Sequence, residues 1–245
     1  MRTTLWLDTG RPWAEILDLG RRAEAAGWDA VRVGDLPWPA LECWSTAGAL
    51  AGRVGRLQLQ AVVDDARGRH PAVVAKLAST VDRLSGGRLL LGLAPGAGPD
   101  AQARLAEVFQ VVKGLVSQPR FSYHGTFFQL RSAPLDPRPH QHPFPLLLHG
   151  GNSDLAARHA DHWSLDRGAG EVAAALAQLD AACADVGRDR AEVTVSAPYP
   201  TTGVDEWVVP ASALGRDRAR QDRTLAAIAA EAVSPASGWP GPQSS

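Results

Sequence analysis

The chain has 245 residues, a formal net charge of -1 and 45% hydrophobic residues, as expected of a globular protein with a sizeable core. It has no surplus of basic residues, so we expect no binding to nucleic acid or to an anionic membrane surface. Its cysteines, Cys43 and Cys183, are too few for a disulfide framework and fit a reducing compartment. Because the sequence shows neither a signal-peptide core nor an apolar run of membrane-spanning length, we expect a cytoplasmic protein.

The first part of the chain alternates between strand and helix patterns. Short apolar segments at residues 3–8, 29–35 and 57–63 are typical of strands. Pro12 and Pro39 can each open a helix after one of these strands, because proline is tolerated in the first helical turn. Such alternation favours a parallel sheet, either doubly wound or closed into a barrel.

The clearest unit of the sequence runs from His70 to Gly98. Pro71 suits the first turn of a helix, apolar residues then recur every three or four positions, and the glycines at 86–87 end the helix. Residues 89–93 are an unbroken apolar run, as in a parallel strand covered on both faces. The strand leads into a glycine-rich loop where backbone can approach a ligand closely. A binding site lined by Gly92, Ala94 and Gly96 is one interpretation of this unit; the alternative is a helix and strand of any α/β protein, without a ligand there.

The second part continues the alternation. The pattern predicts helices at residues 100–116, 154–160, 172–186 and 215–233, a small hairpin at 121–130, and strands at 146–149, 161–165, 193–197 and 204–209. The strand candidates together favour a (β/α)8 barrel of the TIM type, which we expect to occupy residues 1–233 as one domain. Residues 234–245 are rich in Pro, Gly and Ser, and we expect them to be a disordered tail.

One connection does not fit a regular barrel. Residues 199–203 separate the last two strand candidates, whereas a parallel crossover takes about a dozen or more residues. We therefore predict that 193–197 and 204–209 pair antiparallel or do not pair directly, which makes the barrel shortened and irregular there. A missing helix would also leave apolar sheet surface that the helix at 215–233 or a second subunit must cover. On this ground we expect a homodimer.

The motif best suited to an anion is Gly150-Gly151-Asn152-Ser153, directly after the strand at 146–149. Its glycines expose backbone N–H groups, and the Ser153 hydroxyl and a following helix N-terminus favour a phosphate. The alternative is an ordinary turn in which Asn152 or Ser153 caps the helix. The sequence has no dinucleotide or P-loop fingerprint, and the spacing of its histidines does not predict a metal site.

Three segments carry a resemblance to a known family: AGWDAVRVGD from Ala26, HPAVVAKLASTVDRLSGGRLLLGLAPG from His70 and PLLLHGGNSDLAARHADHW from Pro145. In order and spacing they resemble the bacterial-luciferase-like flavin-dependent monooxygenases and oxidoreductases. One branch of that family uses the deazaflavin coenzyme F420. The resemblance implies a (β/α)8 barrel enzyme that uses reduced FMN or reduced F420 on a small organic substrate. A separate flavin reductase then has to be considered as a partner.

The resemblance also implies where the cofactor binds. It places cofactor contacts at the ends of the third and fourth strands and in the glycine motif, namely at Val62, Gly92, Ala94, Gly96, Gly150, Gly151, Asn152 and Ser153. Because the flavin itself supplies the chemistry, no catalytic triad is expected.

Three side chains at strand ends are candidates for catalysis: Asp35, Trp38 and His149. In many F420-using relatives a histidine follows the aspartate of the second strand, whereas Leu36 stands here, which puts that chemistry in doubt. Trp38 could equally pack on the surface, and His149 could be a partly exposed residue without a role. The alternative function is therefore a catalytically degenerate barrel that binds flavin or a partner without turnover.

Overall fold

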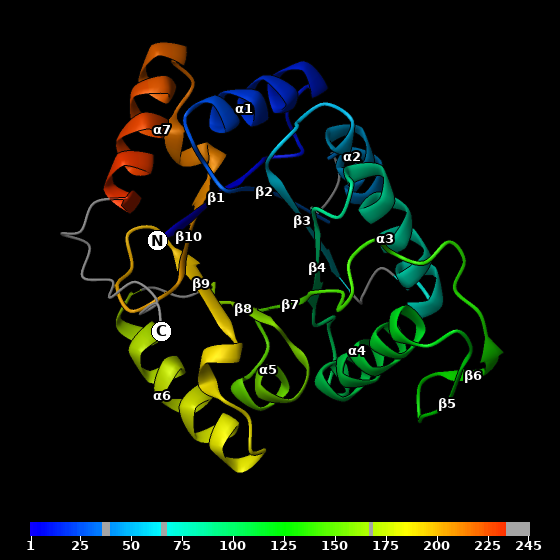
Figure 1. The fold of residues 1–245 in the computed structure, drawn as a ribbon. Helices are drawn as coiled ribbons and strands as arrows, with labels where there is room; N and C mark the ends of the chain where they lie inside the picture. Colours follow the sequence, from blue (N-terminus) through cyan, green and yellow to red (C-terminus); the bar gives the residue numbers. More distant parts are fainter. Residues whose placement is uncertain (36–39, 65–67, 167–168, 234–245) are drawn as a thin grey trace, which may run out of the picture.

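Eight parallel strands close into a barrel at the centre of the computed structural model (Figure 1). The structure describes residues 1–35, 40–64, 68–166 and 169–233. Around the barrel the strands follow the order β1-β10-β9-β8-β7-β4-β3-β2. Their bounds are Arg2–Trp6 (β1), Ala30–Gly34 (β2), Gln58–Asp64 (β3), Leu89–Ala94 (β4), Leu146–His149 (β7), His162–Ser164 (β8), Thr194–Pro198 (β9) and Glu206–Pro210 (β10). The prediction of a (β/α)8 barrel is confirmed.

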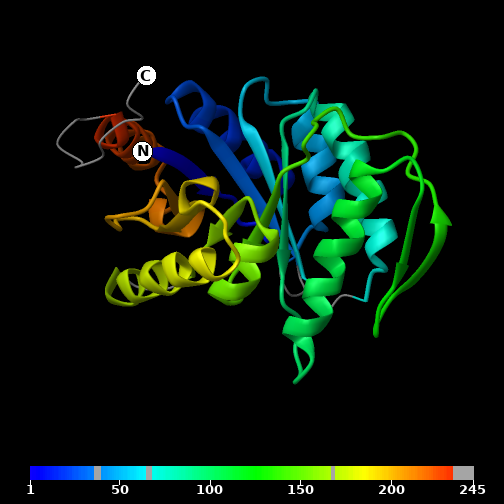
Figure 2. The same cartoon turned by 60° about the horizontal axis from the view of Figure 1, so that its bottom comes forward.

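Helices surround the barrel on its outside, as two views of the ribbon show (Figures 1 and 2). Their bounds are Trp13–Ala25 (α1), Cys43–Ala51 (α2), Pro71–Ser85 (α3), Ala101–Ser117 (α4), Ser153–His159 (α5), Ala169–Asp185 (α6) and Arg218–Val233 (α7), with short 3-10 turns at Arg190–Glu192 (η2) and Ala211–Leu214 (η3). Local signals set the helix ends. At the start of α3 the His70 ring accepts a hydrogen bond from the Ala72 N–H at 3.2 Å, and Gly86 ends the helix with a φ of 68°.

The two faces of the barrel wall differ in chemistry. Outward-facing strand residues such as Leu5, Val33 and Leu91 are apolar and pack with the helices into one large core. Inside the barrel Val62, Leu90 and Leu147 form a small apolar cluster, with Ala94 packed against it. Because side chains alternate between the two faces of a strand, Arg32, Gln60 and Glu206 point inward as well, beside a few further apolar residues such as Ala30 and Val208. This departs from the usual TIM-barrel interior, which is filled by branched apolar side chains.

The predicted hairpin is confirmed and lies outside the barrel beyond α3 and α4 (Figure 1). It consists of β5 (Phe121–His124) and β6 (Gln129–Ala133), which pair antiparallel. The Glu107 carboxylate of α4 accepts hydrogen bonds from three successive backbone N–H groups of the turn, at Thr126, Phe127 and Phe128, over 2.6–3.1 Å. The turn is thus fixed by one buried acidic side chain.

The prediction for the last two strands is wrong, because β9 and β10 pair directly and in parallel. In their register Ser196 lies beside Glu206 and Pro198 lies beside Val208, so β10 begins only two residues below the end of β9. At about 3.3 Å per residue the chain has to return only about 7 Å. The connecting residues 199–205 can cover that distance without a helix. The rule for crossover length assumes a return along a whole strand, and here the overlap is short.

The apolar face without a crossover helix is covered by the chain itself. The ring of Tyr199 packs edge-on against Trp207 with centroids 5.1 Å apart, and the Trp207 indole N–H donates to the Thr201 carbonyl at 2.6 Å. Trp207 is only 4% exposed as a result. On the same side of the barrel, α7 buries Leu225 and Ile228. The connection therefore covers this face as a helix does elsewhere, and for the described residues this removes the argument that a second subunit must cover it.

Two expectations concern the ends and the environment of the chain. Residues 234–245, expected to be a disordered tail, lie outside the described residues. Within the described ranges, no helix is both long enough and apolar enough to cross a lipid bilayer.

Candidate active site

The carboxyl ends of the barrel strands form a mouth whose floor consists of side chains from opposite strands. Trp6 ends β1 and His149 ends β7, which lie four strands apart in either direction around the barrel. Their rings meet edge-on with centroids 5.2 Å apart. A Cβ added at Gly34 would lie 3.6 Å from the Trp6 ring, so the missing side chain leaves room for the indole. Ligands of such barrels bind at this end, which makes the floor the candidate site.

The β3–β4 side of this floor is apolar and closely packed. Val62 fills the space beside Gly92, where an added Cβ would come within 2.7 Å of Val62 Cγ2 and 3.2 Å of Leu147 Cδ2. Gly92 is therefore required by packing inside the barrel wall rather than by a ligand. Ala94 packs on this cluster at the mouth and is partly exposed there. Together these residues give the mouth an apolar wall.

The opposite side of the barrel interior is polar and contains a fully buried cation. Arg32 has no exposed surface, donates through Nε to Gln60 Oε1 at 2.8 Å and through Nη1 to Ser164 Oγ at 2.7 Å. Its guanidinium lies 5.4 Å from the centroid of the Trp6 ring. Burial lowers the pKa of Arg32 to about 10, against the charges of Glu206 and Asp166, so the side chain stays protonated at neutral pH. A positive charge is thus held beneath the floor.

Glu206 supplies the buried acidic partner of this network. Its Oε1 accepts hydrogen bonds from Gln60 Nε2 at 2.8 Å and from the Thr4 hydroxyl. Gln60 therefore bridges Arg32 and Glu206 through its two amide atoms. No direct ion pair joins the two charges within the described part of the chain, although both side chains are fully buried.

His149 is an uncharged imidazole at neutral pH. Burial lowers its pKa to about 4, the positive charge of Arg32 acts in the same direction, and Asp166 opposes both. Its Nδ1 is buried and has no hydrogen-bond partner among the described residues. A neutral ring can donate or accept one hydrogen bond, but it offers no charge to a phosphate. His149 is therefore better suited to the uncharged part of a ligand.

Asp35 does not face the mouth as a free carboxylate. The Arg69 guanidinium donates to its Oδ2 at 2.8 Å and to Glu42 Oε1 at 3.0 Å. The Asp35 side chain is only 6% exposed. Arg69 thus joins the segments that follow β2 and β3 to the start of α2, where Glu42 caps the helix by accepting from the Ser45 N–H. These ion pairs of Arg69 join three segments at the rim of the mouth and have a structural role.

In the glycine motif after β7 the structure shows the helix cap that the sequence offered as the alternative to an anion site. Gly150 and Gly151 adopt positive φ values of 67° each, and the Asn152 side chain caps α5 by accepting from the Leu155 N–H at 2.8 Å. The loop is fixed to the barrel by the Trp163 indole, which donates to the Gly150 carbonyl at 2.7 Å. Ser153 is partly exposed and makes no side-chain hydrogen bond with the described residues. The Gly150 N–H donates to the Ser164 carbonyl at 2.9 Å, so an anion anchor would have to use the N–H groups of Gly151 to Ser153, which the N-cap does not engage.

The structure places most of the sequence-derived site residues around one mouth. Val62, Ala94, His149 and the glycine motif border it, whereas Gly92 is buried in the wall and Gly96 lies in the loop beyond β4. Trp38 and Leu36 lie outside the described residues.

Sequence reasoning missed the buried network and Trp6. The signal was present: Arg32 interrupts an apolar strand, Gln60 does the same in β3, and Glu206 opens β10. A charge inside a strand that is covered on both faces has to point into the barrel of a closed sheet and be paired there. Which residues pair with it depends on strand order, and a single sequence does not contain that information.

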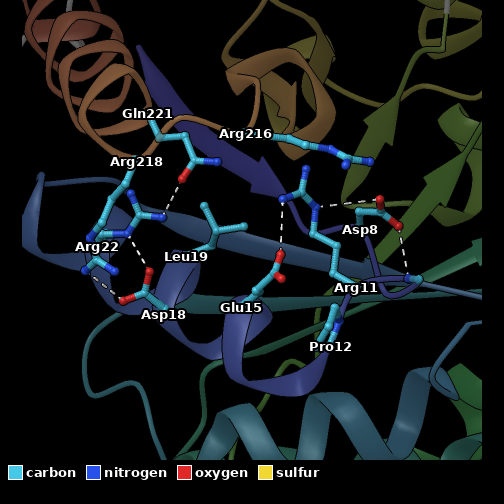
Figure 3. Close-up of a pocket in the computed structure, with 11 residues that line it drawn as sticks. Asp8, Arg11, Pro12, Glu15, Asp18, Leu19, Arg22, Arg216, Arg218 and Gln221 are labelled. Carbon is cyan, nitrogen blue, oxygen red and sulfur yellow. Dashed lines mark hydrogen bonds and ion pairs between the residues drawn. The ribbon is translucent and has the colours of Figure 1, made fainter.

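A second feature at this end is a crevice of about 510 Å³ between α1 and the start of α7 (Figure 3). Most of the arginines that line it pair with carboxylates: Arg22 pairs with Asp18 at 2.8 Å, and Arg218 pairs with the same carboxylate at 3.0 Å. Arg11 lies 3.6–3.7 Å from Asp8 and Glu15. The crevice lies outside the barrel wall, and its charges largely offset one another. We therefore assign the site to the mouth.

The described residues contain no group of three or more metal-ligating side chains. Cys43 and Cys183 are free thiols. Burial raises the pKa of the Cys43 thiol, and Asp35 and Glu42 add to the effect, which makes this sulfur a poor nucleophile. Metal and thiolate chemistry are therefore not supported in this part of the chain.

Comparison with known proteins gives a family match over most of the chain. A family model described as luciferase-like monooxygenase matches residues 1–206. The chain is 30% identical over 181 residues to an FMNH(2)-dependent dimethylsulfone monooxygenase of Pseudomonas putida, covering 66% of this chain and 46% of that protein. It is 29% identical over 150 residues to an F420-dependent glucose-6-phosphate dehydrogenase of Microbacterium testaceum, covering 52% and 44%. The chain thus spans about half the length of these two relatives.

Solved structures share the fold. The coenzyme F420-dependent tetrahydromethanopterin reductase of Methanopyrus kandleri superposes with a TM-score of 0.74 at 18% identity, covering 80% of this chain and 65% of that one. At that identity the likeness concerns the barrel architecture alone.

Proposed function

From the premise that this chain belongs to the luciferase-like monooxygenase family, we propose that it is an oxidoreductase using reduced FMN or reduced F420 on a small organic substrate. The observation that carries the proposal is the floor of the barrel mouth. It joins an apolar wall at Val62 and Ala94 to the Trp6 and His149 rings, above the buried cation of Arg32. An apolar slot with a few fixed polar groups is what a flavin ring requires.

The residues at the mouth fit a phosphorylated flavin in two respects. The Gly150 N–H donates to the Ser164 carbonyl at 2.9 Å, so the backbone N–H groups of Gly151, Asn152 and Ser153, at the start of α5, would hold the anion. The orphaned Nδ1 of His149 is a polar atom in an otherwise apolar surrounding and can serve a ring heteroatom or a substrate oxygen. Bound there, the coenzyme would supply the hydride or oxygen chemistry.

The chain's own residues would bind and orient the coenzyme and shield it from water. Val62 and Trp6 would contact apolar surface and exclude water from the reacting face. His149 would hold or accept one proton at a ring nitrogen, since it is uncharged at neutral pH. Ser153 and the backbone before α5 would hold the phosphate. Asp35 is not assigned a proton-transfer role, because Arg69 already engages its carboxylate.

The choice between the two coenzymes belongs to this proposal. The relatives include both an FMNH(2)-dependent and an F420-dependent enzyme. Leu36, which stands where F420-using relatives have a histidine, weighs toward FMN. With FMN, a separate reductase would have to supply the reduced form. We propose a cytoplasmic homodimer on the family resemblance alone, and light scattering tests its mass directly.

The first experiment is an anaerobic titration of the purified chain with reduced FMN and with reduced F420, followed by fluorescence. Saturable binding of one coenzyme below about 1 mM is expected. If neither binds in that range, the enzyme proposal fails.

The phosphate position is tested with Ser153→Ala. Loss of one hydrogen bond to a charged group costs about 1.5–3 kcal/mol, which weakens coenzyme binding about ten- to a hundredfold. Ser212→Ala in the exposed 3-10 turn η3 is the matched control and should bind normally. A valine at Gly151 is less informative, because its positive φ and a Cβ 3.0 Å from Leu148 Cδ1 would strain the loop by themselves. Unchanged affinity in Ser153→Ala would place the phosphate elsewhere, for example beyond Gly92.

A second candidate function is a barrel that binds flavin without turnover. Two observations favour it: Arg69 is hydrogen-bonded to the Asp35 carboxylate, and His149 is uncharged. Few groups at the mouth are then able to transfer a proton. Coenzyme binding without oxygen consumption or product over a broad substrate panel would support it. Substrate-dependent turnover would exclude it.

A further inference from the structure

Four inward-facing polar residues form a continuous row across one side of the barrel. In the strand register His149 of β7 lies beside Ser164 of β8, Ser164 beside Ser196 of β9, and Ser196 beside Glu206 of β10. Paired positions of parallel strands direct their side chains to the same face. The row therefore leads from the buried Glu206 to the floor of the mouth at His149.

Arg32 contacts this row at its middle and the mouth at its end. Its Nη1 donates to Ser164 Oγ at 2.7 Å, and the guanidinium lies under the Trp6 ring that packs against His149. Gln60 accepts from Arg32 Nε and donates to Glu206 Oε1, both at 2.8 Å. A cation and a carboxylate are thus held in one network without direct contact among the described residues.

Three buried atoms of this network have no hydrogen-bond partner within the described ranges of the chain: Arg32 Nη2, Ser196 Oγ and Glu206 Oε2. Ser196 lies in register between Ser164, which binds Arg32, and Glu206. Their chemistry is complementary, since Nη2 can only donate, the carboxylate can only accept and the hydroxyl can do both. A buried charge with unsatisfied hydrogen-bonding atoms is costly, and a bound water with two to four polar partners is the usual remedy.

We propose that a water molecule bound between Arg32, Ser196 and Glu206 completes a buried ion pair, and that Arg32 serves as a fixed positive charge for an anionic group bound over Trp6. The charge acts strongly at the mouth because the guanidinium is fully buried and lies 5.4 Å from the centroid of the Trp6 ring. His149 already responds to it, since Arg32 disfavours the imidazolium form. The groups that face His149 electrostatically are Arg32 from β2 and Asp166 after β8.

The chemical class of ligand follows from this charge. An electron-rich ring, an enolate or a carboxylate is favoured over the corresponding neutral form. Reduced FMN carries a negative charge on its ring system that oxidised FMN lacks, so the reduced form should bind more tightly. This part of the inference rests on the proposed function, whereas the effect on His149 does not.

The first test uses the chain without coenzyme and follows the His149 ring protons by NMR from pH 7 to pH 4, assigned with His149→Gln. Arg32→Met is expected to raise the His149 pKa by at least one unit, whereas Arg32→Lys keeps the charge and should leave the pKa low. An unchanged pKa in folded Arg32→Met would overturn the proposal.

The second test compares the affinities of reduced and oxidised FMN. Arg32→Met should lower the preference for reduced FMN at least tenfold, and Glu206→Gln, which keeps the shape but removes the counter-charge, should raise it. If Arg32→Met does not fold, the direction of the Glu206→Gln change decides. An equal preference in wild type and Glu206→Gln would refute the electrostatic role. If neither form of FMN binds the wild type, the proposed function fails while the NMR result still tests Arg32.

A crystal structure tests the water. Density for an ordered water within hydrogen-bond distance of both Arg32 Nη2 and Glu206 Oε2 is expected, together with its loss in Ser196→Val. Direct contact between the guanidinium and the carboxylate, without a water, would overturn that part of the proposal.

Discussion

The pKa of His149 tests directly whether the floor of the mouth is buried from solvent and lies in a positive electrostatic potential. Its pKa is about 4 in the folded chain, because burial and Arg32 both disfavour the imidazolium, whereas an unfolded histidine has a pKa of about 6.5. At pH 7 both states are neutral, so the residue costs almost nothing. Below pH 6.5 the unfolded chain binds a proton that the folded chain does not, and stability falls until both are protonated near pH 4.

The magnitude follows from the two pKa values. Between pH 7 and pH 5 the linkage relation gives a loss of about 2 kcal/mol in the free energy of unfolding from this residue alone. Urea unfolding at pH 7, 6 and 5 measures it as the difference in pH dependence between wild type and His149→Gln. All other titrating groups are shared by the two proteins and largely cancel. The variant should therefore lose about 2 kcal/mol less than wild type over this range.

The control is His124→Gln, because His124 is exposed in the β5–β6 hairpin and far from the barrel mouth. It tests whether replacing any histidine by glutamine alters the pH dependence. If His149→Gln and wild type lose stability in parallel, His149 titrates as an ordinary solvated histidine. The description of a buried, uncharged ring at the floor would then be wrong.

Three further changes test the packing that forms the site. Gly92→Ala should destabilise the chain by about 1–3 kcal/mol in urea unfolding, because its Cβ would overlap the barrel interior. The control is Gly48→Ala inside α2, which has no atom within 4 Å of its Cβ and should stabilise the chain by about 0.5–1 kcal/mol. If both variants change the free energy of unfolding in the same direction, the packing argument for Gly92 is wrong. Arg69→Met leaves the buried Asp35 carboxylate unpaired and should cost about 1–3 kcal/mol at pH 7, with the loss largely removed in the double variant that also carries Asp35→Asn. Trp207→Phe removes one buried hydrogen bond and should lower stability by about 1–3 kcal/mol; a thermal midpoint equal to that of wild type would show that the short connection is not held by this indole.

Part of the candidate site could be predicted from the sequence alone. The structure has the predicted strand that ends before Gly150 and Gly151, and the Asn152 cap that follows. Both depend on local backbone chemistry. The position of His149 at a strand end was equally local. Its lowered pKa was not, because that depends on Arg32, which is distant in the sequence and adjacent only in the closed barrel.

By itself the sequence determined the elements of the fold. The alternation of strands and helices could be predicted without coordinates, because its signals depend on neighbouring residues. These signals are the helical periodicity, the proline and glycines around α3, and the unbroken apolar run of β4. The resemblance of three segments then implied the closure into a barrel.

Only the tertiary structure decided register and pairing. The short overlap of β9 and β10 allows a parallel return that the length of their connection seemed to forbid. The same register sets Ser196 between Ser164 and Glu206 and brings Arg32 beneath the mouth. Such contacts join residues far apart in the chain, and their energies depend on distance and burial rather than on neighbouring residues. For that reason the sequence contains the polar residues of the barrel interior, but only the closed sheet makes them a site.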